Sequence, residues 1–274
     1  MYSLNTSTQA ALEEMLQNTA RPPPADFLPV YFNHSVIGCL NPEFIPYLQE
    51  TLGQDPIDLI VLDPQRLFIS QARPIEVSQS LQALTERLRA GGFIPGWRNE
   101  EFAWLDVEGH EHFRLERAAF KTFGFRSLAA HINGYTKNGL IWLGRRSESK
   151  SIDPGRLDNL SAGGISADET PWVCAKRELW EEAGVPIHLA QAIQPAGRIP
   201  MRRVSPPLGF HDELLFVYDL ELPDHFVPTN HDGEVSGFIE VSYAEAAARI
   251  LADEFTADAS LVTADFILRH SKLK

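Results

Sequence analysis

Three glutamates in the second half of the chain have a spacing that suits divalent metal chemistry. Glu178, Glu181 and Glu182 stand at positions i, i+3 and i+4, so a helix would bring their carboxylates to one side within a single turn. Such crowding destabilises an isolated helix, and Arg177 offsets only about 0.3–0.5 kcal/mol through its i,i+4 pair with Glu181. Mg²⁺ prefers oxygen ligands and would compensate the remaining charge. The simpler interpretation is a solvated acidic face, which many surface helices carry.

The residues around these glutamates predict a helix with both ends marked. Thr170 is a favourable N-cap, Pro171 suits the first helical position, and Gly184 can adopt the left-handed conformation that ends a helix. Apolar residues recur between these ends on one stripe that can face a core, namely Trp172, Ala175, Leu179 and Ala183. The packing face of the helix is therefore accounted for without the glutamates.

The stretch from Gly163 to Val185 resembles the Nudix box. That box is a glycine, five residues, Glu, seven residues, Arg-Glu-aliphatic, one residue, Glu-Glu, one residue, then glycine and an aliphatic residue. Every fixed position is matched here, by Gly163, Glu169, Arg177, Glu178, Leu179, Glu181, Glu182, Gly184 and Val185. The resemblance favours a metal site over a solvated acidic face.

The resemblance to Nudix hydrolases carries expectations about fold and chemistry. It implies an α+β fold, an α/β/α sandwich around a mixed sheet, that hydrolyses small organic diphosphates with Mg²⁺ or Mn²⁺. It also implies that Glu181 and Glu182 hold the metal and that Glu178 either holds metal or acts as the general base. The Gly163 carbonyl would supply a further ligand.

Supporting residues follow from the same resemblance. Arg177 and Glu169 would orient the glutamates through charge-assisted hydrogen bonds. Many Nudix enzymes use one more acid from a later loop, and Glu234 is the residue expected there, with Asp232 and Glu213 behind it.

Residues outside the box resemble one Nudix branch in particular. That branch includes the Nudix part fused to thiamine pyrophosphokinase in some fungi, together with an N-terminal region of unassigned function. The matching residues are 145–147, 150, 154–155, 157–159, 162–164, 218–223, 232–235 and 265–270, and in the N-terminal region 96–100, 116–119 and 123–124. The branch implies removal of the terminal phosphate from thiamine diphosphate, particularly from damaged oxo or oxy forms, leaving a monophosphate.

Two basic clusters are expected to contact substrate. Arg145, Arg146 and Lys150 follow an apolar run and precede the Gly-Gly turn, where they could hold diphosphate oxygens that the metal leaves free. Arg198 and Arg202, with Arg203 beside them, stand on a predicted loop rich in proline, and such loops often carry specificity. The alternative for each cation is simple surface solubility.

An aromatic wall for a flat cationic ring is expected at Trp97. Cation–π contact and stacking would contribute about 0.5–2 kcal/mol there. Trp97 is preferred over Trp104 and Trp142 because it would give the N-terminal region a reason to be attached, although tryptophans are more often core residues.

Composition narrows the function classes. The 274 residues include 24 Lys and Arg against 37 Asp and Glu, a formal charge of −13, so attraction to nucleic acid or an anionic membrane is not expected. Two cysteines, no apolar stretch of membrane-spanning length and no signal-like start indicate a cytoplasmic protein. A homodimer is compatible with the sequence.

The order of predicted elements divides the chain near residue 125. Residues 1–125 are expected to form a smaller α+β domain of unassigned function, and residues 126–274 the Nudix hydrolase domain. The second part contains predicted strands at 127–135, 140–143, 214–222 and 235–241 and late helices at 243–253 and 260–269.

Other functions are compatible with the sequence. A Nudix pyrophosphatase acting on a nucleoside diphosphate derivative such as ADP-ribose would use the same glutamates, and a catalytically silent Nudix module could sense a ligand. Isopentenyl diphosphate isomerase shares a Nudix-like fold but needs a placed cysteine. Cys39 stands far from the box, and Cys174 lies within the predicted helix, so this chemistry is disfavoured.

Overall fold

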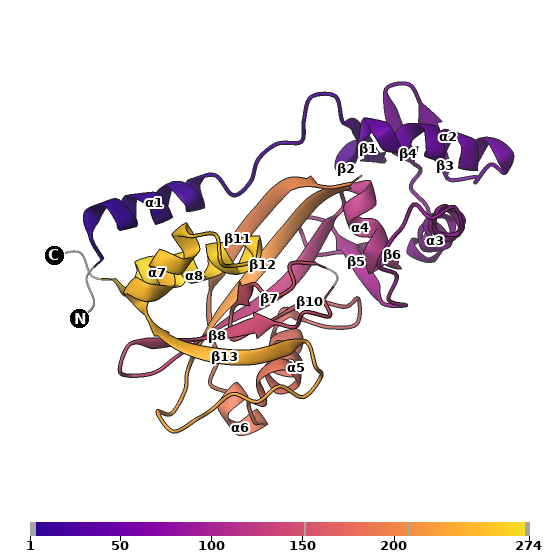
Figure 1. Cartoon of the computed structure of the whole chain (residues 1–274). Helices are drawn as coiled ribbons and strands as arrows, with labels where there is room; N and C mark the ends of the chain where they lie inside the picture. Colours follow the sequence, from indigo (N-terminus) through magenta and orange to yellow (C-terminus); the bar gives the residue numbers. More distant parts are fainter. Residues whose placement is uncertain (1–3, 151, 208, 272–274) are drawn as a thin grey trace.

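The computed structural model describes residues 4–150, 152–207 and 209–271. Within them a seven-stranded mixed sheet forms the centre of the C-terminal half, with the path β11-β12-β7-β8-β13, β10 paired to β7 and β9 to β8. Strand β12 runs parallel to β7, and the remaining pairs are antiparallel (Figure 1). The strands are β7 (Arg126–Tyr135), β8 (Leu140–Arg146), β9 (Leu157–Asp158), β10 (Ser161–Gly164), β11 (Gln194–Ser205), β12 (Gly209–Glu221) and β13 (Val235–Ser242).

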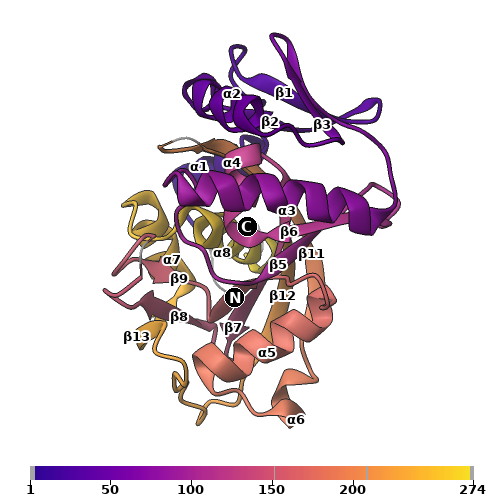
Figure 2. The same cartoon turned by 90° about the vertical axis from the view of Figure 1, so that its right-hand side faces the viewer.

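Helices cover both faces of this sheet. On one face lie α5 (Pro171–Ala183) and α6 (Ile187–Ala190), and on the other α7 (Tyr243–Leu251) and α8 (Ala257–His270) (Figures 1 and 2). Successive side chains of β7 point to opposite faces of the sheet, so Ala130 packs with Leu179 of α5 whereas Ala129 packs with Val262 of α8. The expected α/β/α sandwich around a mixed sheet is confirmed.

Strand β11 corrects one sequence expectation. The prolines around Arg198 and Arg202 predict a loop, but Gln194–Ser205 pairs with β12 along its length. The loop prediction is wrong because β11 lies at the edge of the sheet, where Pro195 and Pro200 need no N–H for a second neighbour.

The N-terminal half has its own four-stranded sheet, with strand order β2-β1-β4-β3. A two-stranded hairpin and helix α4 follow it and lead into β7. The elements are β1 (Leu28–Phe32), β2 (Ser35–Leu40), the short helix η1 (Pro42–Phe44), α2 (Ile45–Gln54), β3 (Ile60–Asp63), β4 (Arg66–Ile69), α3 (Pro74–Ala90), β5 (Glu101–Leu105), β6 (Glu111–Glu116) and α4 (Arg117–Phe123).

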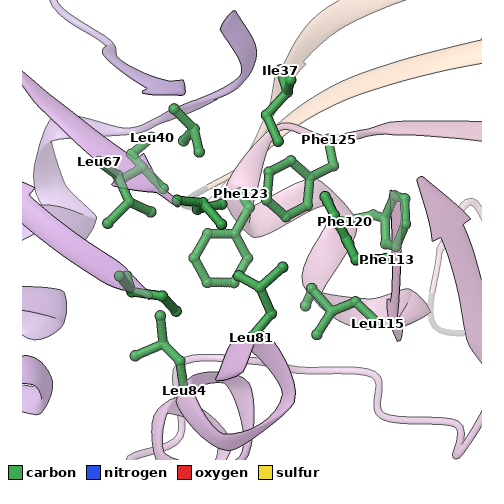
Figure 3. Close-up of a cluster of buried hydrophobic side chains, with 14 of the residues drawn as sticks. Ile37, Leu40, Leu67, Leu81, Leu84, Phe113, Leu115, Phe120, Phe123 and Phe125 are labelled. Atoms are coloured by element: carbon green, nitrogen blue, oxygen red, sulfur yellow. The ribbon is translucent and has the colours of Figure 1, made fainter. Parts of the chain in front are cut away.

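One hydrophobic cluster unites this half. Phe123 and Phe125 stack with ring centroids 5.4 Å apart, and Leu81 and Leu84 of α3 approach them from the facing side (Figure 3). The cluster therefore holds β6 and α4 firmly at the point where the chain enters β7. Helix α4, together with Phe102 of β5, borders the site described below.

Helix α1 (Thr6–Gln17) packs elsewhere. Its buried Leu12 joins the cluster formed by α7 and α8, and the helix lies along them in Figure 1. Helix α1 therefore covers the C-terminal half of the chain, although the two are distant in sequence. Among the described helices, none is both long and apolar enough to cross a membrane.

Candidate active site

A cavity of about 480 Å³ opens beside the second half of α5 and extends toward the start of α8. Residues from three parts of the chain line it. Glu178 and Glu181 come from α5, Glu213 comes from β12, and Phe102 and Phe120 come from the N-terminal half. The structure therefore brings two of the three predicted glutamates to a cavity rather than to an open helix face, while Glu182 does not line it.

The helix that carries the glutamates has the predicted ends. Thr170 Oγ1 accepts a hydrogen bond from the N–H of Val173 at 3.3 Å, and Gly184 closes the helix at a φ of 63°. Ala175, Leu179 and Ala183 are fully buried against the sheet. With that stripe fixed, the neighbouring glutamates are turned toward the Gly163-Gly164 strand.

Arg177 connects the acidic side chains. Its Nε and Nη2 donate to the two carboxylate oxygens of Glu169 at 2.7 and 2.8 Å. Its Nη1 donates to Glu178 at 2.7 Å and to Glu181 at 2.8 Å. The hydrogen bonds from Arg177 lower the pKa of Glu169, so that carboxylate stays ionised and anchors the guanidinium. This geometry suits the orienting role expected of the pair.

Two of the glutamates are unusually buried for ionisable groups. Glu178 is 8% exposed and Glu182 is 7% exposed. Burial raises the pKa of Glu178 to about 7, although Arg177 acts in the opposite direction. Burial and the neighbouring Glu178 raise the pKa of Glu182 as well, while the Ala162 N–H, which donates to Glu182 at 2.8 Å, lowers it. The protein alone thus leaves these carboxylates short of positive charge.

Gly163 is required by the close approach of α5. A Cβ at this position would overlap the Glu178 carboxylate, so a residue with a side chain would displace it. Strand pairing with Ala130 of β7 fixes the glycine's backbone. Cys174 Sγ lies 3.6 Å from the Gly163 carbonyl oxygen, and burial raises the pKa of this thiol, which argues against a nucleophile.

A later loop brings a further set of acids to the same place. Oxygens of Glu182, Asp232 and Glu234 lie within 4.8 Å of one another. Lys150 Nζ forms an ion pair with Glu234, and Asp232 accepts a hydrogen bond from the Glu234 N–H at 2.8 Å, which holds the turn. A set composed of carboxylate and carbonyl oxygens, with too few cations, fits a hard divalent metal ion.

Comparison with known proteins agrees with this geometry. A model of the NUDIX domain matches residues 126–266. Nudix hydrolase 20, chloroplastic, from Arabidopsis thaliana is 33% identical to this chain over 264 residues, which cover 91% of the chain and 69% of that protein. The chain belongs to the Nudix family.

Further matches are of the same kind. Nudix hydrolase 24, chloroplastic, from the same plant is 32% identical over 258 residues, with 91% of this chain and 69% of that protein covered. The crystal structure of DR0079 from Deinococcus radiodurans shares 23% sequence identity at a TM-score of 0.46, over 60% of this chain and 97% of that one. The expectation of a Nudix hydrolase is confirmed, and the chain is an enzyme of that family.

Only two of the three residues of the first basic cluster line the cavity. Arg146 and Lys150 line the cavity, where Arg146 pairs with Asp158 at 3.0 Å. Arg145 does not line it. Alternation along β8 turns Arg145 outward, where its Nη1 donates to the Gly155 carbonyl oxygen at 2.8 Å.

In the second basic cluster, too, the alternation of side chains along a strand determines which residue lines the cavity. Arg203 lines the cavity, whereas Arg202 and Arg198 do not. Arg203 stands opposite His211 in the β11–β12 pairing, so the two share a face of the sheet. Arg202 faces the other way and pairs with Asp212 at 3.1 Å, and Arg198 lies over the Phe216 ring on that same face.

Trp97 also lies outside the cavity. Its ring is covered by the Arg89 guanidinium at 4.2 Å from the centroid, and its Nε1 donates to Asn99 at 2.8 Å. The next residue, Arg98, lines the cavity instead. The N-terminal half therefore contributes to the site through residues other than the tryptophan singled out from sequence.

Several cavity residues carry no local signal in the sequence. They are Phe102, Phe120, His131, His211 and Asp258. Each comes from a separate element, and only the packing of α4 and α8 against the sheet brings them together. Glu213 was visible as a spare acid, but the structure places it beside His211 rather than beside Glu182.

Proposed function

We propose that this protein hydrolyses the diphosphate linkage of a small organic diphosphate with Mg²⁺, which Mn²⁺ can replace. The observation that carries the proposal is the pair of buried glutamates, Glu178 and Glu182, of which Glu178 lines the cavity with Arg177 as its main counter-charge. Buried charges of one sign are retained when a cation completes the site. We also infer that residues 126–274 form the hydrolase domain, with the preceding half supplying one wall of the cavity.

The metal would be held by Glu181, Glu182, the Gly163 carbonyl and Glu234, with Glu178 as a further ligand or as the general base. When bound, a divalent cation neutralises charge on the diphosphate and acidifies water. The Glu178 carboxylate, with its pKa of about 7, can accept a proton from an attacking water near neutral pH.

The cations of the cavity would handle the phosphates. Arg146 and Lys150 line it and can donate to oxygens that the metal leaves free. Both are already tied to acids, Arg146 to Asp158 and Lys150 to Glu234, so their positions are set before substrate arrives. Attack by water needs no covalent intermediate on the protein.

For the substrate we propose thiamine diphosphate or its oxidised analogues, converted to the monophosphate. The support is the resemblance of stretches 145–147, 154–155, 157–159, 218–223 and 265–270 to the thiamine pyrophosphokinase-associated branch. ADP-ribose is the comparison substrate, because it presents a diphosphate linked on both sides.

The test measures phosphate and monophosphate release with and without Mg²⁺. Thiamine diphosphate, its oxo and oxy analogues, ADP-ribose, nucleoside diphosphates and isopentenyl diphosphate form the panel. Glu182→Gln and Glu181→Gln should each lower turnover on the best substrate by at least about 100-fold, since both carboxylates are assigned to the metal. Glu240→Gln, an exposed glutamate on β13, is the matched control and should retain activity. Undiminished Mg²⁺-dependent hydrolysis in both active-site variants would refute the proposal.

A further inference from the structure

Three buried polar atoms cluster at the α8 end of the cavity without a hydrogen-bond partner. They are His211 Nδ1, Arg203 Nε and Asp258 Oδ1, which remain unpaired within the part of the chain that the structure describes. All three residues line the cavity, and His211 is only 4% exposed. A buried polar atom without a hydrogen bond is unfavourable, so these three atoms are available to a ligand that hydrogen-bonds to them.

Strand pairing holds these groups together. Arg203 and His211 are direct cross-strand partners in β11 and β12. His211 Nε2 lies 3.2 Å from Glu213, which also accepts a hydrogen bond from Ser127 Oγ at 2.8 Å. One ring nitrogen of His211 is thus fixed by Glu213 while the other remains available. Asp258, in the first turn of α8, interacts electrostatically with both His211 and Arg203.

A few residues along β7 separate this cluster from the residues expected to hold the metal. Gly163 pairs with Ala130 of β7, and Glu213 pairs with Ser127 of the same strand. Three residues of a β-strand span about 10 Å. Both ends line one cavity, so an extended organic diphosphate held at the glutamates can reach His211 with its organic group.

The N-terminal half closes the space between these two ends. Phe102 lies against Gly164, where a Cβ would come within 2.5 Å of its ring. Phe102 contacts Phe120 edge to face at 5.5 Å, and Lys121 follows in α4, near enough for its charge to act on Glu213. Both phenylalanines and Lys121 line the cavity.

The charges of this end are balanced. Lys121 and Arg203 oppose Glu213 and Asp258, so neither a strongly anionic nor a strongly cationic group is favoured. The same two cations disfavour a metal ion on His211, Glu213 and Asp258, although their ligand atoms lie within 4.8 Å of one another. What the unpaired atoms can accept is an uncharged group that both donates and accepts hydrogen bonds.

We propose that His211, Arg203 and Asp258 form a recognition subsite for one ring in the organic part of the substrate, and that this ring is an uncharged nitrogen heterocycle with amino or oxo substituents. The inference rests on the proposed function for its orientation of the substrate. Asp258 accepts from the amino group, Arg203 donates to a ring nitrogen or carbonyl, and His211 serves either role. A site built of such groups rejects analogues that lack them, because its own polar atoms then stay unpaired.

Binding is measured first, without catalysis. Isothermal titration with thiamine monophosphate and with AMP, in EDTA, reports affinity independently of metal and turnover. Asp258→Asn, nearly isosteric, should weaken binding of at least one of these by about tenfold or more, as should Arg203→Gln. Asp224→Asn, an exposed aspartate outside the cavity, is the matched control. Thermal unfolding verifies that each variant is folded.

Specificity is measured second. For the same variants, kcat/KM should fall about tenfold or more on the heterocyclic diphosphate that the wild type hydrolyses best, and should stay unchanged on isopentenyl diphosphate. The inference is overturned if both substrates lose equally, if neither loses, if neither monophosphate binds the wild type, or if Mn²⁺ alone binds in a His211-dependent manner. Monophosphate binding without any hydrolysis by the wild type would instead refute the proposed function and leave the subsite standing.

Discussion

Replacing Glu178 with glutamine should make the metal-free protein more stable while impairing catalysis. Glu178 is 8% exposed, and burial raises its pKa from 4.5 to about 7. At 1.36 kcal/mol per pKa unit, keeping the carboxylate ionised in the fold costs about 3 kcal/mol. Glutamine has nearly the same shape and can still accept the hydrogen bond from Arg177 Nη1, so Glu178→Gln removes most of that cost.

The pH dependence has a definite sign. Because the pKa of Glu178 is higher in the folded than in the unfolded protein, the folded state holds more protons between about pH 4.5 and 7. Wild-type stability should therefore fall as pH rises through that window, and Glu178→Gln should lack this part of the fall. The two proteins should be similar in stability at pH 4.5 and differ by about 2–3 kcal/mol at pH 8.

Urea unfolding in EDTA at pH 4.5, 6 and 8 measures this difference. Glu240→Gln, on the exposed face of β13, should follow the wild type at every pH. Added Mg²⁺ should stabilise the wild type more than Glu178→Gln, since the carboxylate is then neutralised by the ion. The reasoning would be refuted if Glu178→Gln were less stable than the wild type at pH 8 without metal. It would also be refuted if the difference in the free energy of unfolding were the same at all three pH values.

Two further substitutions test the support around the glutamates. Gly163→Ala should push the Glu178 carboxylate aside and lower kcat/KM on the order of 100-fold. Gly237→Ala is the control, because a Cβ there meets nothing within 4 Å, and it should retain activity. Equal activities of the two variants would contradict the steric argument. Arg177→Lys keeps the charge but loses the paired hydrogen bonds to Glu169, so the Mg²⁺ concentration for half-maximal activity should rise about 10–100-fold. A Mg²⁺ titration of the variant checks this, and an unchanged midpoint would show that Arg177 does not orient the ligands.

The tertiary structure decided which of the other predicted residues reach the cavity. Arg202 and Arg203 are equivalent in the sequence, yet the register of β11 on β12 directs only Arg203 inward. Trp97 and Arg98 differ in the same way. Arg98 lines the cavity, whereas the Trp97 ring packs against Arg89 in the N-terminal half. Register and packing depend on partners distant in the chain, and a local pattern does not contain them.

The glutamate cluster and its helix were determined by the sequence itself. The cap at Thr170, the glycine at Gly184 and the spacing of Glu178 and Glu182 act within one helix, whose geometry is the same in any fold. The subsite at His211 is different in kind. It exists only because β11 and β12, which follow one another in the chain, meet the start of α8 and are closed by α4, and both helices are distant from these strands in sequence.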